Sequence, residues 1–279
     1  MVKSAKFDRM ALQAFSPAEK IGLLATLNEA GLPHITLITS IMAKDEETLM
    51  LGQFSVGLSK RHVLSNSKTG FLVMTLKRQL WRGTALWEGS VTSGKDYIRY
   101  NELPMFRYNT YFGINTVHYF NLCATTLAES LPLGKIACAS LLGLLAAGRA
   151  KEEGEGLKPF AMSLFNSLRS LKFVAYINAE GFPLIIPLIQ LRAAAPNRLI
   201  FSPCAYAEEI AEIPPGAVVA VFCLTMGMES VLVRGVISDS KRRCGVRLRE
   251  IAVNWVYNSM PPCHGQIYPP VPLVPVREF

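Results

Sequence analysis

The stretch GLSKRHVLSN, residues 57–66, places a hydroxyl group and two cations where a short helix is expected to begin. Ser59 offers an O–H donor, Lys60 a mobile positive charge and Arg61 a second cation. The first turn of a helix also exposes unpaired N–H groups and the positive end of the helix dipole. These groups together are typical of a phosphate-binding site, but cations in a loop are also typical of an ordinary solvated surface. The ten residues by themselves leave both interpretations open.

An internal repeat indicates which elements hold this loop in place. The sequence LLATLNEAGLP, residues 23–33, resembles FVAYINAEGFP, residues 173–183, at a constant offset of 150 residues. Four positions are identical in the two copies: Ala25, Asn28, Gly31 and Pro33 recur as Ala175, Asn178, Gly181 and Pro183. Apolar runs that flank an Asn/Gly turn predict a β-hairpin in each copy.

The similarity between the two halves continues through later apolar runs. HITLITSIM corresponds to LIIPLIQLR, and ALWEGSVTS parallels VLVRGVISD with Gly89 opposite Gly235. About six short, regularly spaced strands in each half predict a sandwich or a barrel. A repeat of about 150 residues indicates a duplicated domain rather than a solenoid unit. The polar segment AKEEGEGLKP, residues 150–159, is the expected linker, which gives domains 1–149 and 150–279.

Helices are expected between the strands. FSPAEKIG predicts a helix with Ser16 as N-cap. Residues 97–145 are expected to be mostly helical, and the apolar window 136–148 to be a buried helix, because it is shorter than the roughly 20 residues that span a bilayer. Residues 248–256 follow helical spacing. The proline-rich segment 261–279 is expected to be extended, either against the body of the protein or free.

Composition favours anionic partners without choosing among them. The 279 residues carry a formal charge of +8, the pI is about 9.2, and half of the residues are hydrophobic. This excludes global disorder. The basic segment 241–250 is interpreted as the solvated face of an amphipathic helix, so neither a nucleic acid nor a membrane is expected as a partner.

The cysteines and the N-terminal residues indicate a reducing compartment. The six cysteines form no C-x-x-C pair, and with the four histidines they show no metal-ligand spacing, so no metal site is expected. Most of the cysteines lie in apolar stretches and are interpreted as reduced core thiols. The segment MVKSAKFDRM contains no apolar run of the kind found in a secretory signal. We therefore expect a cytoplasmic protein.

Three segments follow one another along the first half: ATLNEAGLPHITLITS, LMLGQFSVGLSKRHVLSNSKTGFLVM and WEGSV. Their order resembles that of the pyridoxamine 5′-phosphate oxidase-like superfamily of FMN-binding split barrels. The resemblance covers residues 16–93 well and residues 165–239 more faintly, and its weight lies in the order and spacing of short motifs. It implies a mainly β fold with helices (α+β), built as two tandem split β-barrels of antiparallel strands with connecting helices. It also implies FMN as the cofactor.

The resemblance assigns roles to residues of the first half. Ser59 and Lys60 fall where the family binds the phosphate of FMN, with Arg61 as a possible helper. The strand that lies against the flavin ring corresponds to Thr36, Leu37, Ile38 and Thr39, and the strand end that reaches the cofactor corresponds to Phe54 and Ser55. Thr84 falls where the family's oxidases commonly place a glutamine near the flavin, which puts a ring contact there in doubt.

The second half departs from this pattern. FSPCAYAEEIAEIPPG occupies the position of the phosphate loop and carries Glu208 and Glu209 where cations are expected. Two carboxylates beside a phosphate would repel it. We therefore expect the second barrel to have kept the fold and lost the phosphate site. The flavin cleft is then formed either within one chain, as a pseudo-dimer, or between two chains of a homodimer.

The aromatic segment MFRYNTYFGINTVHYFNL, residues 105–122, is either a substrate lid or a core helix that contains a satisfied histidine. Arg107, Tyr108, Tyr111 and His118 are the candidate contacts with a small-molecule redox substrate. The chain shows no Ser-His-Asp order, paired-carboxylate pattern or P-loop, and no catalytic residue is assigned.

The leading functional hypothesis is a flavin-dependent oxidoreductase of unknown substrate. The tail PLVPVREF lacks the Arg and His motif with which the true oxidases grip the substrate phosphate, so pyridoxamine phosphate oxidation is not expected. One alternative is a non-catalytic module that binds or senses a flavin, a deazaflavin (F420) or haem. A second alternative is a scaffold that has lost its ligand.

Overall fold

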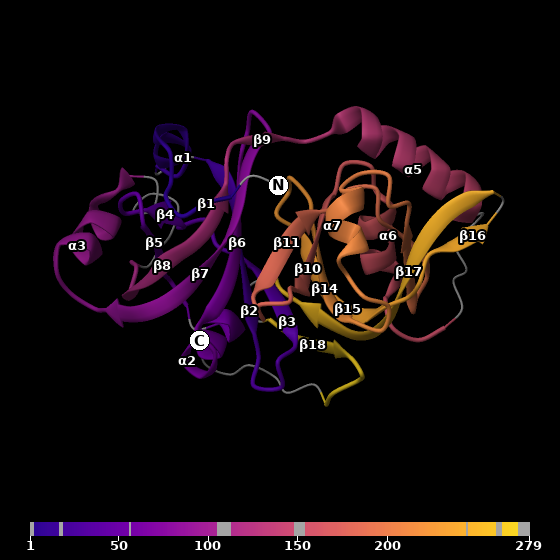
Figure 1. Cartoon of the computed structure of the whole chain (residues 1–279). Helices are drawn as coiled ribbons and strands as arrows, with labels where there is room; N and C mark the ends of the chain where they lie inside the picture. The colour runs from indigo at the N-terminus through magenta and orange to yellow at the C-terminus, as the bar shows by residue number, and fades with distance from the viewer. Residues whose placement is uncertain are drawn as a thin grey trace. The chain divides into compact units, whose positions relative to one another are not determined.

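The described residues form two nine-stranded antiparallel sheets with the same strand order (Figure 1). The computed structural model describes residues 3–16, 19–55, 57–104, 113–147, 154–243, 245–260 and 264–272. The first sheet has the order β3 (Pro33–Leu37), β2 (Lys20–Leu27), β6 (Lys68–Thr75), β7 (Gln79–Val91), β8 (Thr116–Thr126), β5 (Thr48–Gln53) and β4 (Met42–Ala43). Two short strands complete it: β1 (Lys3–Ser4) pairs with β8, and β9 (Glu129–Ser130) pairs with β7.

The second sheet repeats this path strand for strand. Its order is β11 (Pro183–Pro187), β10 (Leu171–Ile177), β14 (Val218–Leu224), β15 (Ser230–Ile237), β17 (Val246–Asn258), β13 (Arg198–Phe201) and β12 (Arg192–Ala195). The strands β16 (Lys241–Arg243) and β18 (Gly265–Tyr268) both pair with β17. The repeat found in the sequence is thus a repeat of topology. The expected fold class, two tandem split β-barrels of antiparallel strands with connecting helices, is confirmed.

Six helices connect the strands of the described residues, and four of them form two equivalent pairs. They are α1 (Arg9–Ala14), α2 (Leu58–Ser65), α3 (Lys95–Glu102), α5 (Leu133–Ala147), α6 (Pro159–Asn166) and α7 (Ala207–Ala211). The helices α1 and α6 precede the first hairpin of each repeat, and α2 and α7 follow the strands β5 and β13. No helix among the described residues is long and apolar enough to cross a membrane.

The predicted hairpins are present, and the same side chain closes both turns. The Oδ1 atom of Asn28 accepts a hydrogen bond from the backbone N–H of Leu32 over 2.8 Å, and Asn178 does the same for Phe182 over 2.8 Å. Gly31 has a φ of 71° and Gly181 a φ of 79°, a backbone conformation that glycine adopts without a Cβ clash. The Asn/Gly signal in the sequence therefore has a direct structural cause.

The chain separates into two compact units that do not follow the repeat boundary. One unit comprises Met1–Leu131 and Ala175–Ile185, and the other comprises Pro132–Val174 and Ile186–Phe279. Within the first unit, Lys68 Nζ donates to the carbonyl of Glu180 over 2.6 Å. The boundary expected between residues 149 and 150 lies outside the described residues.

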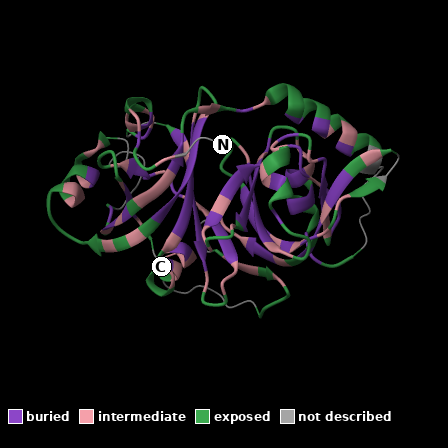
Figure 2. Cartoon of the chain, in the orientation of Figure 1, coloured by how far each residue is buried: buried purple, intermediate pink, exposed green. Residues whose placement is uncertain are grey.

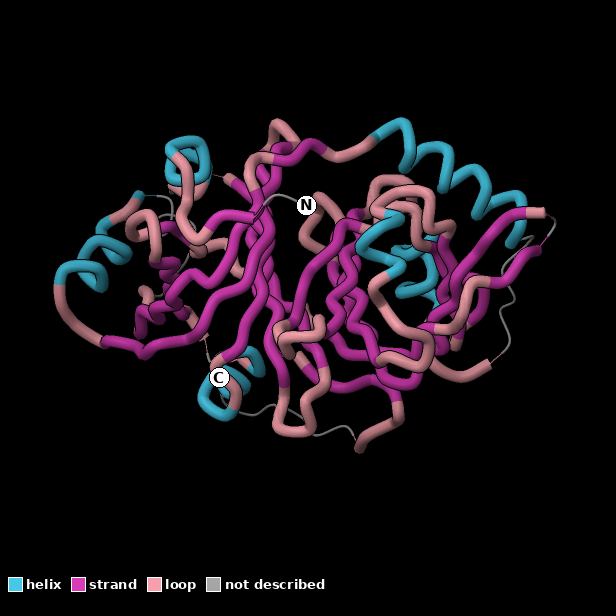
Figure 3. Tube along the Cα trace, in the orientation of Figure 1, coloured by secondary structure: helices cyan, strands magenta, loops and turns pink. Residues whose placement is uncertain are grey.

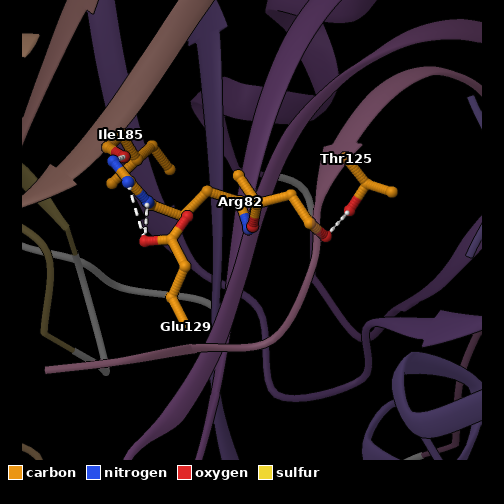
Figure 4. Close-up of polar contacts among 5 residues, drawn as sticks. Arg82, Thr125, Glu129 and Ile185 are labelled. Atoms are coloured by element: carbon orange, nitrogen blue, oxygen red, sulfur yellow. Dashed lines mark hydrogen bonds and ion pairs between the residues drawn. The ribbon is translucent and has the colours of Figure 1, made fainter. Parts of the chain in front are cut away.

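Arg82 on β7 holds the short strand β9 in the first unit (Figure 4). Its Nε and Nη2 atoms both donate to Oε2 of Glu129, over 3.2 and 2.8 Å, and its Nη1 atom donates to the carbonyl of Ile185 over 3.5 Å. Arg82 is buried, so this ion pair is largely screened from water.

An aromatic core fills the first barrel. The ring of Phe15 lies 5.9 Å from that of Trp81 and 6.2 Å from that of Phe71, both edge to face, and Phe7 packs against the same group. Edge-to-face contacts add to the burial of apolar area. Figure 2 shows the buried residues concentrated along the central strands.

Three helical predictions are wrong (Figure 3). Residues 97–145 contain the eleven-residue strand β8 between two helices, and residues 248–256 lie in β17. The basic segment 241–250 is a hairpin of β16 and β17, not an amphipathic helix. In each case pairing with neighbouring strands on the sheet overrides a local pattern that was compatible with a helix.

Two predictions about helix position and burial also need correction. The N-cap of the first helix is Asp8, whose Oδ1 accepts from the N–H of Ala11 over 2.7 Å; Ser16 follows the helix, and Pro17 is outside the described residues. The described part of the apolar window, residues 136–147, does belong to a helix, α5. However, Leu141, Leu144 and Leu145 are each more than half exposed, so this helix is buried on one side only.

The glycine correspondence also changes. Gly83 lies opposite Phe71 across the strands β6 and β7, and Gly235 lies opposite Val219 across β14 and β15. The two hairpin turns match at an offset of 150 residues, because Arg78 and Met228 both have a positive φ, and the bulge between Thr84 and Ala85 matches the bulge between Arg234 and Gly235 at that offset. Gly235 therefore corresponds to Ala85 rather than to Gly89.

Candidate cofactor-binding site

The opening loop leads into α2, whose N-terminus carries no side-chain cap. The N-cap residue is Gly57, which has no side chain to accept from the first-turn N–H groups. Such groups must bind water or a ligand. The helix is held against the first hairpin, because Nδ1 of His62 lies 3.0 Å from Oγ1 of Thr26 and the ring of His62 lies 5.1 Å from that of His34. The free donors therefore sit on a fixed element.

Ser59, in the first turn of α2, is fully buried. Its Oγ atom finds no hydrogen-bond partner among the described residues. A buried hydroxyl without a partner costs about 1–3 kcal/mol, which an acceptor on a ligand would recover. Solvent does not reach this atom, so a ligand contacts it only if a neighbouring side chain moves aside.

Lys60 follows directly and is half-buried. Burial lowers the pKa of its ammonium group to about 8. Among the described residues, no carboxylate lies within 4 Å of Nζ to offset this loss of hydration. Arg61, in contrast, is exposed. A desolvated cation without a counter-ion is the electrostatic condition that favours binding of an anion.

A second group of polar side chains joins three strands near this helix. His118 on β8 is buried, and its Nδ1 atom lies 3.2 Å from the indole Nε1 of Trp87 on β7. Its Nε2 atom lies 2.8 Å from Oε1 of Gln53 at the end of β5. Burial first, and then the charge of Lys60, lower the pKa of His118 to about 4. His118 is therefore neutral at pH 7, and its electrostatic interaction with Lys60 links this group to the helix N-terminus.

The strand assigned to the flavin ring lies at the edge of the first sheet. Thr36 and Leu37 end β3 and are half-buried, and Thr39 follows the strand in a similar environment. Ile38 is buried in the apolar core. Among the described strands, the edge strand β3 pairs only with β2.

The remaining assigned residues are dispersed. Phe54 packs beside the apolar cluster that contains Met42 and Tyr100, and Ser55 is exposed. Thr84 is buried on β7 opposite Ala124, six residues along β8 from His118, or about 20 Å of strand. The structure thus places Lys60 within electrostatic reach of His118 and places Thr84 elsewhere.

Of the four candidate substrate contacts, the described residues include one. Arg107, Tyr108 and Tyr111 lie outside the described residues. His118 is described, but it lies on a strand, so the reading of its segment as a helix was wrong from residue 116 onward. Gln53 and Trp87 were missed, because no spacing in the sequence links Trp87 to a histidine 31 residues later. Only the register of β7, β8 and β5 joins them.

The equivalent position in the second barrel has the opposite charge. The helix α7 is five residues long, and its first turn contains Glu208 and Glu209. Carboxylates at a helix N-terminus satisfy its dipole and repel an anion. That the second barrel lacks a phosphate site stays an expectation.

The fold defines the chain as a tandem split-barrel protein. No protein-family model and no curated protein matches it. Among solved structures, it is similar to an FMN-binding protein from Syntrophomonas wolfei, with 15% identity, a TM-score of 0.35, and coverage of 44% of this chain and 84% of that chain. It is also similar to a NimC/NimA family protein from Clostridium acetobutylicum, with 14% identity, a TM-score of 0.33, and coverage of 43% and 89%.

A third similar structure is HupZ of Group A Streptococcus, with 15% identity, a TM-score of 0.35, and coverage of 43% of this chain and 91% of that chain. The similar structures are pyridoxamine 5′-phosphate oxidase-like, FMN-binding, NimC/NimA and F420 reductase proteins, and each spans about half of the chain. At these identities and TM-scores, the similar structures give no argument about which ligand this chain binds.

Proposed function

We propose that the first barrel binds the phosphate group of FMN at the N-terminus of α2. The observation that carries this proposal is Lys60, a desolvated cation beside the orphaned hydroxyl of Ser59 at a helix start without a side-chain cap. A phosphate dianion would accept from the free N–H groups and from Ser59, and would stabilise the ammonium form of Lys60. Arg61 adds charge from the exposed side of the helix.

Thr36, Leu37, Ile38 and Thr39 would hold the flavin ring. Thr36 and Leu37 end the edge strand β3 and Ile38 and Thr39 follow it, so that backbone groups and the two threonine hydroxyls would meet the polar edge of a planar ring. When bound, FMN supplies reversible hydride and electron transfer, while the protein supplies orientation and electrostatics. On this basis we propose a flavin-dependent oxidoreductase that acts on a small redox substrate in the cytoplasm.

A binding role without catalysis is the second candidate. His118 is neutral at pH 7, and both of its ring nitrogens are engaged, so it offers neither a proton nor a free lone pair. A site without a charged general acid favours storage or sensing of a flavin or a deazaflavin. The same two hydrogen bonds disfavour His118 as a haem ligand, because a metal needs an unprotonated and uncommitted nitrogen.

The experiment is a titration with FMN and with riboflavin, followed by flavin fluorescence, because the two ligands differ only in the phosphate. The wild-type protein should bind FMN about 10- to 100-fold more tightly, the range expected for charge-assisted hydrogen bonds. Lys60→Glu should remove this preference while leaving riboflavin binding in place. The control is Lys77→Glu, the same charge change at an exposed turn of the first unit.

Equal affinity of the wild-type protein for FMN and riboflavin would contradict the phosphate site. Reduction of the bound flavin by a nicotinamide donor, followed by reoxidation by an added acceptor, would separate the oxidoreductase from the binding module.

A further inference from the structure

The protonation state of His118 follows from its two partners. An indole N–H can only donate, so Nδ1 of His118, 3.2 Å from Trp87 Nε1, must accept. Burial keeps the imidazole neutral, and a neutral imidazole carries one proton. That proton is therefore on Nε2, and His118 is the Nε2–H tautomer.

The tautomer in turn sets the orientation of Gln53. The Nε2–H group of His118 donates across 2.8 Å and requires an acceptor, so the facing atom of Gln53 is its amide oxygen. The amide NH2 is then directed away from the imidazole. It makes no hydrogen bond among the described residues, and it is not one of the unpartnered side-chain atoms that are sealed from solvent. The chain Trp87–His118–Gln53 thus ends in a donor of fixed direction.

The position of this donor connects it to the proposed phosphate site. Gln53 is the last residue of β5, and α2 begins at Leu58, five residues later. The charge of Lys60 acts on the imidazole that holds Gln53. The positive charge of Lys60 therefore acts both on an oxygen acceptor of a ligand bound there and on the imidazole that holds the Gln53 amide.

We propose that Gln53 donates a hydrogen bond from its side-chain NH2 to an oxygen of the phosphate bound at Lys60, and that Trp87 and His118 are positioning residues that hold this orientation. The inference rests on the proposed function. Its ligand class is a phosphate monoester, and it adds a neutral donor to the charged and backbone donors of α2. A fixed donor loses little entropy on binding, because its rotamer is already set.

The first test uses FMN, riboflavin and inorganic phosphate as separate probes. Gln53→Leu should weaken FMN and phosphate by about 5- to 10-fold, the value of one hydrogen bond to a charged group, and leave riboflavin unchanged. An equal loss for riboflavin would overturn the proposal, because the amide would then contact the ring. No loss for any probe would overturn it as well.

The second test asks whether Trp87 acts through Gln53. Trp87→Phe keeps an aromatic ring but removes the N–H, so His118 can adopt the other tautomer and Gln53 can rotate its oxygen toward the ligand. We expect this variant to weaken phosphate binding in the wild-type background and to have no further effect in the Gln53→Leu background. Additive losses would mean that Trp87 has a merely structural role.

The third test needs no ligand. It therefore distinguishes a failure of the proposed function from a failure of the hydrogen-bonded chain Trp87–His118–Gln53, here called the relay. The ¹⁵N chemical shifts of His118, assigned with His118→Gln, should show the Nε2–H tautomer in the wild-type protein and a mixture in Trp87→Phe. An Nδ1–H tautomer in the wild-type protein would overturn the relay. A correct tautomer in a protein that binds neither FMN nor phosphate would retain the relay and reject both the proposed function and the contact of Gln53 with phosphate.

Discussion

Gly83 on β7 and Gly235 on β15 lie on equivalent strands, two residues apart in register, and each lies against a carbonyl group of the next strand. A Cβ on Gly83 would meet the carbonyl oxygen of Ala124 and the ring of Phe71. A Cβ on Gly235 would meet the carbonyl oxygen of Ala252 and, at 2.7 Å, the side chain of Ile251. Both glycines permit a close approach of backbone to backbone where the sheet curves.

Alanine at either glycine should destabilise the protein. Because the obstacle is largely backbone, the strands must separate, and we expect Gly83→Ala and Gly235→Ala each to lower the free energy of unfolding by about 2 kcal/mol or more. Gly89 is the matched control, since a Cβ there meets nothing within 4 Å. Urea denaturation would measure all three. A loss of the same size for Gly89→Ala would show that the contact is not the cause.

The ion pair of Arg82 and Glu129 should contribute to stability in a way that surface pairs do not. Glu129→Ala removes the carboxylate that pairs with Arg82 over 2.8 Å, while the guanidinium of Arg82, whose side chain is 6% exposed, stays buried. We expect a loss of about 2–3 kcal/mol in the free energy of unfolding, moderated by the partial exposure of Glu129.

The comparison for this prediction is Glu47→Ala, which breaks the 2.8 Å ion pair with Lys6. Both partners of that pair are about 60% exposed. Water screens such pairs, so no measurable change is expected. Similar losses for the two variants, measured by chemical denaturation, would be incompatible with the role assigned to burial.

Binding of a phosphate ligand should weaken as the pH rises above about 8. Burial lowers the pKa of Lys60 to about 8 in the free protein, so above this pH the ligand must bind together with a proton. The affinity for FMN should then fall by up to about tenfold per pH unit. Lys60→Arg provides the control, because a guanidinium stays protonated throughout and its affinity should remain level to pH 10. A parallel decline in both proteins would assign the effect to another group.

His118 should make the fold sensitive to acid. The pKa of His118 is lowered from 6.5 to about 4 in the folded state, so between these pH values the unfolded chain binds a proton that the folded chain excludes. The free energy of unfolding should therefore decrease as the pH falls from 6.5 to 4, by about 2 kcal/mol in total. His118→Gln keeps one donor and one acceptor but does not titrate, and it should flatten this part of the stability curve. An unchanged slope in the variant would contradict the assignment.

Local signals in the sequence account for the parts of the fold that local chemistry controls. Asn28 and Gly31 predict the hairpin turn because one amide and one positive φ close it, and the same residues recur at 178 and 181. Ser59 and Lys60 were also identified locally, as a hydroxyl and a cation where a helix begins. The pairing of distant strands could not be predicted from local patterns. A helix was expected in place of β8 because of its composition, and in place of β17 because of the spacing of its apolar residues.

The sequence by itself determined the duplication, the split-barrel class and the position of the loop before α2, because identical residues at a constant offset repeat the same turns and strand runs. Only the tertiary structure decided which side chains meet that loop. Gln53, Trp87 and His118 come from three strands, and their hydrogen bonds depend on the register that pairs Leu51 with His118 and Trp87 with Phe120. A shift of one residue would turn His118 to the other face of the sheet, and no local pattern encodes that choice.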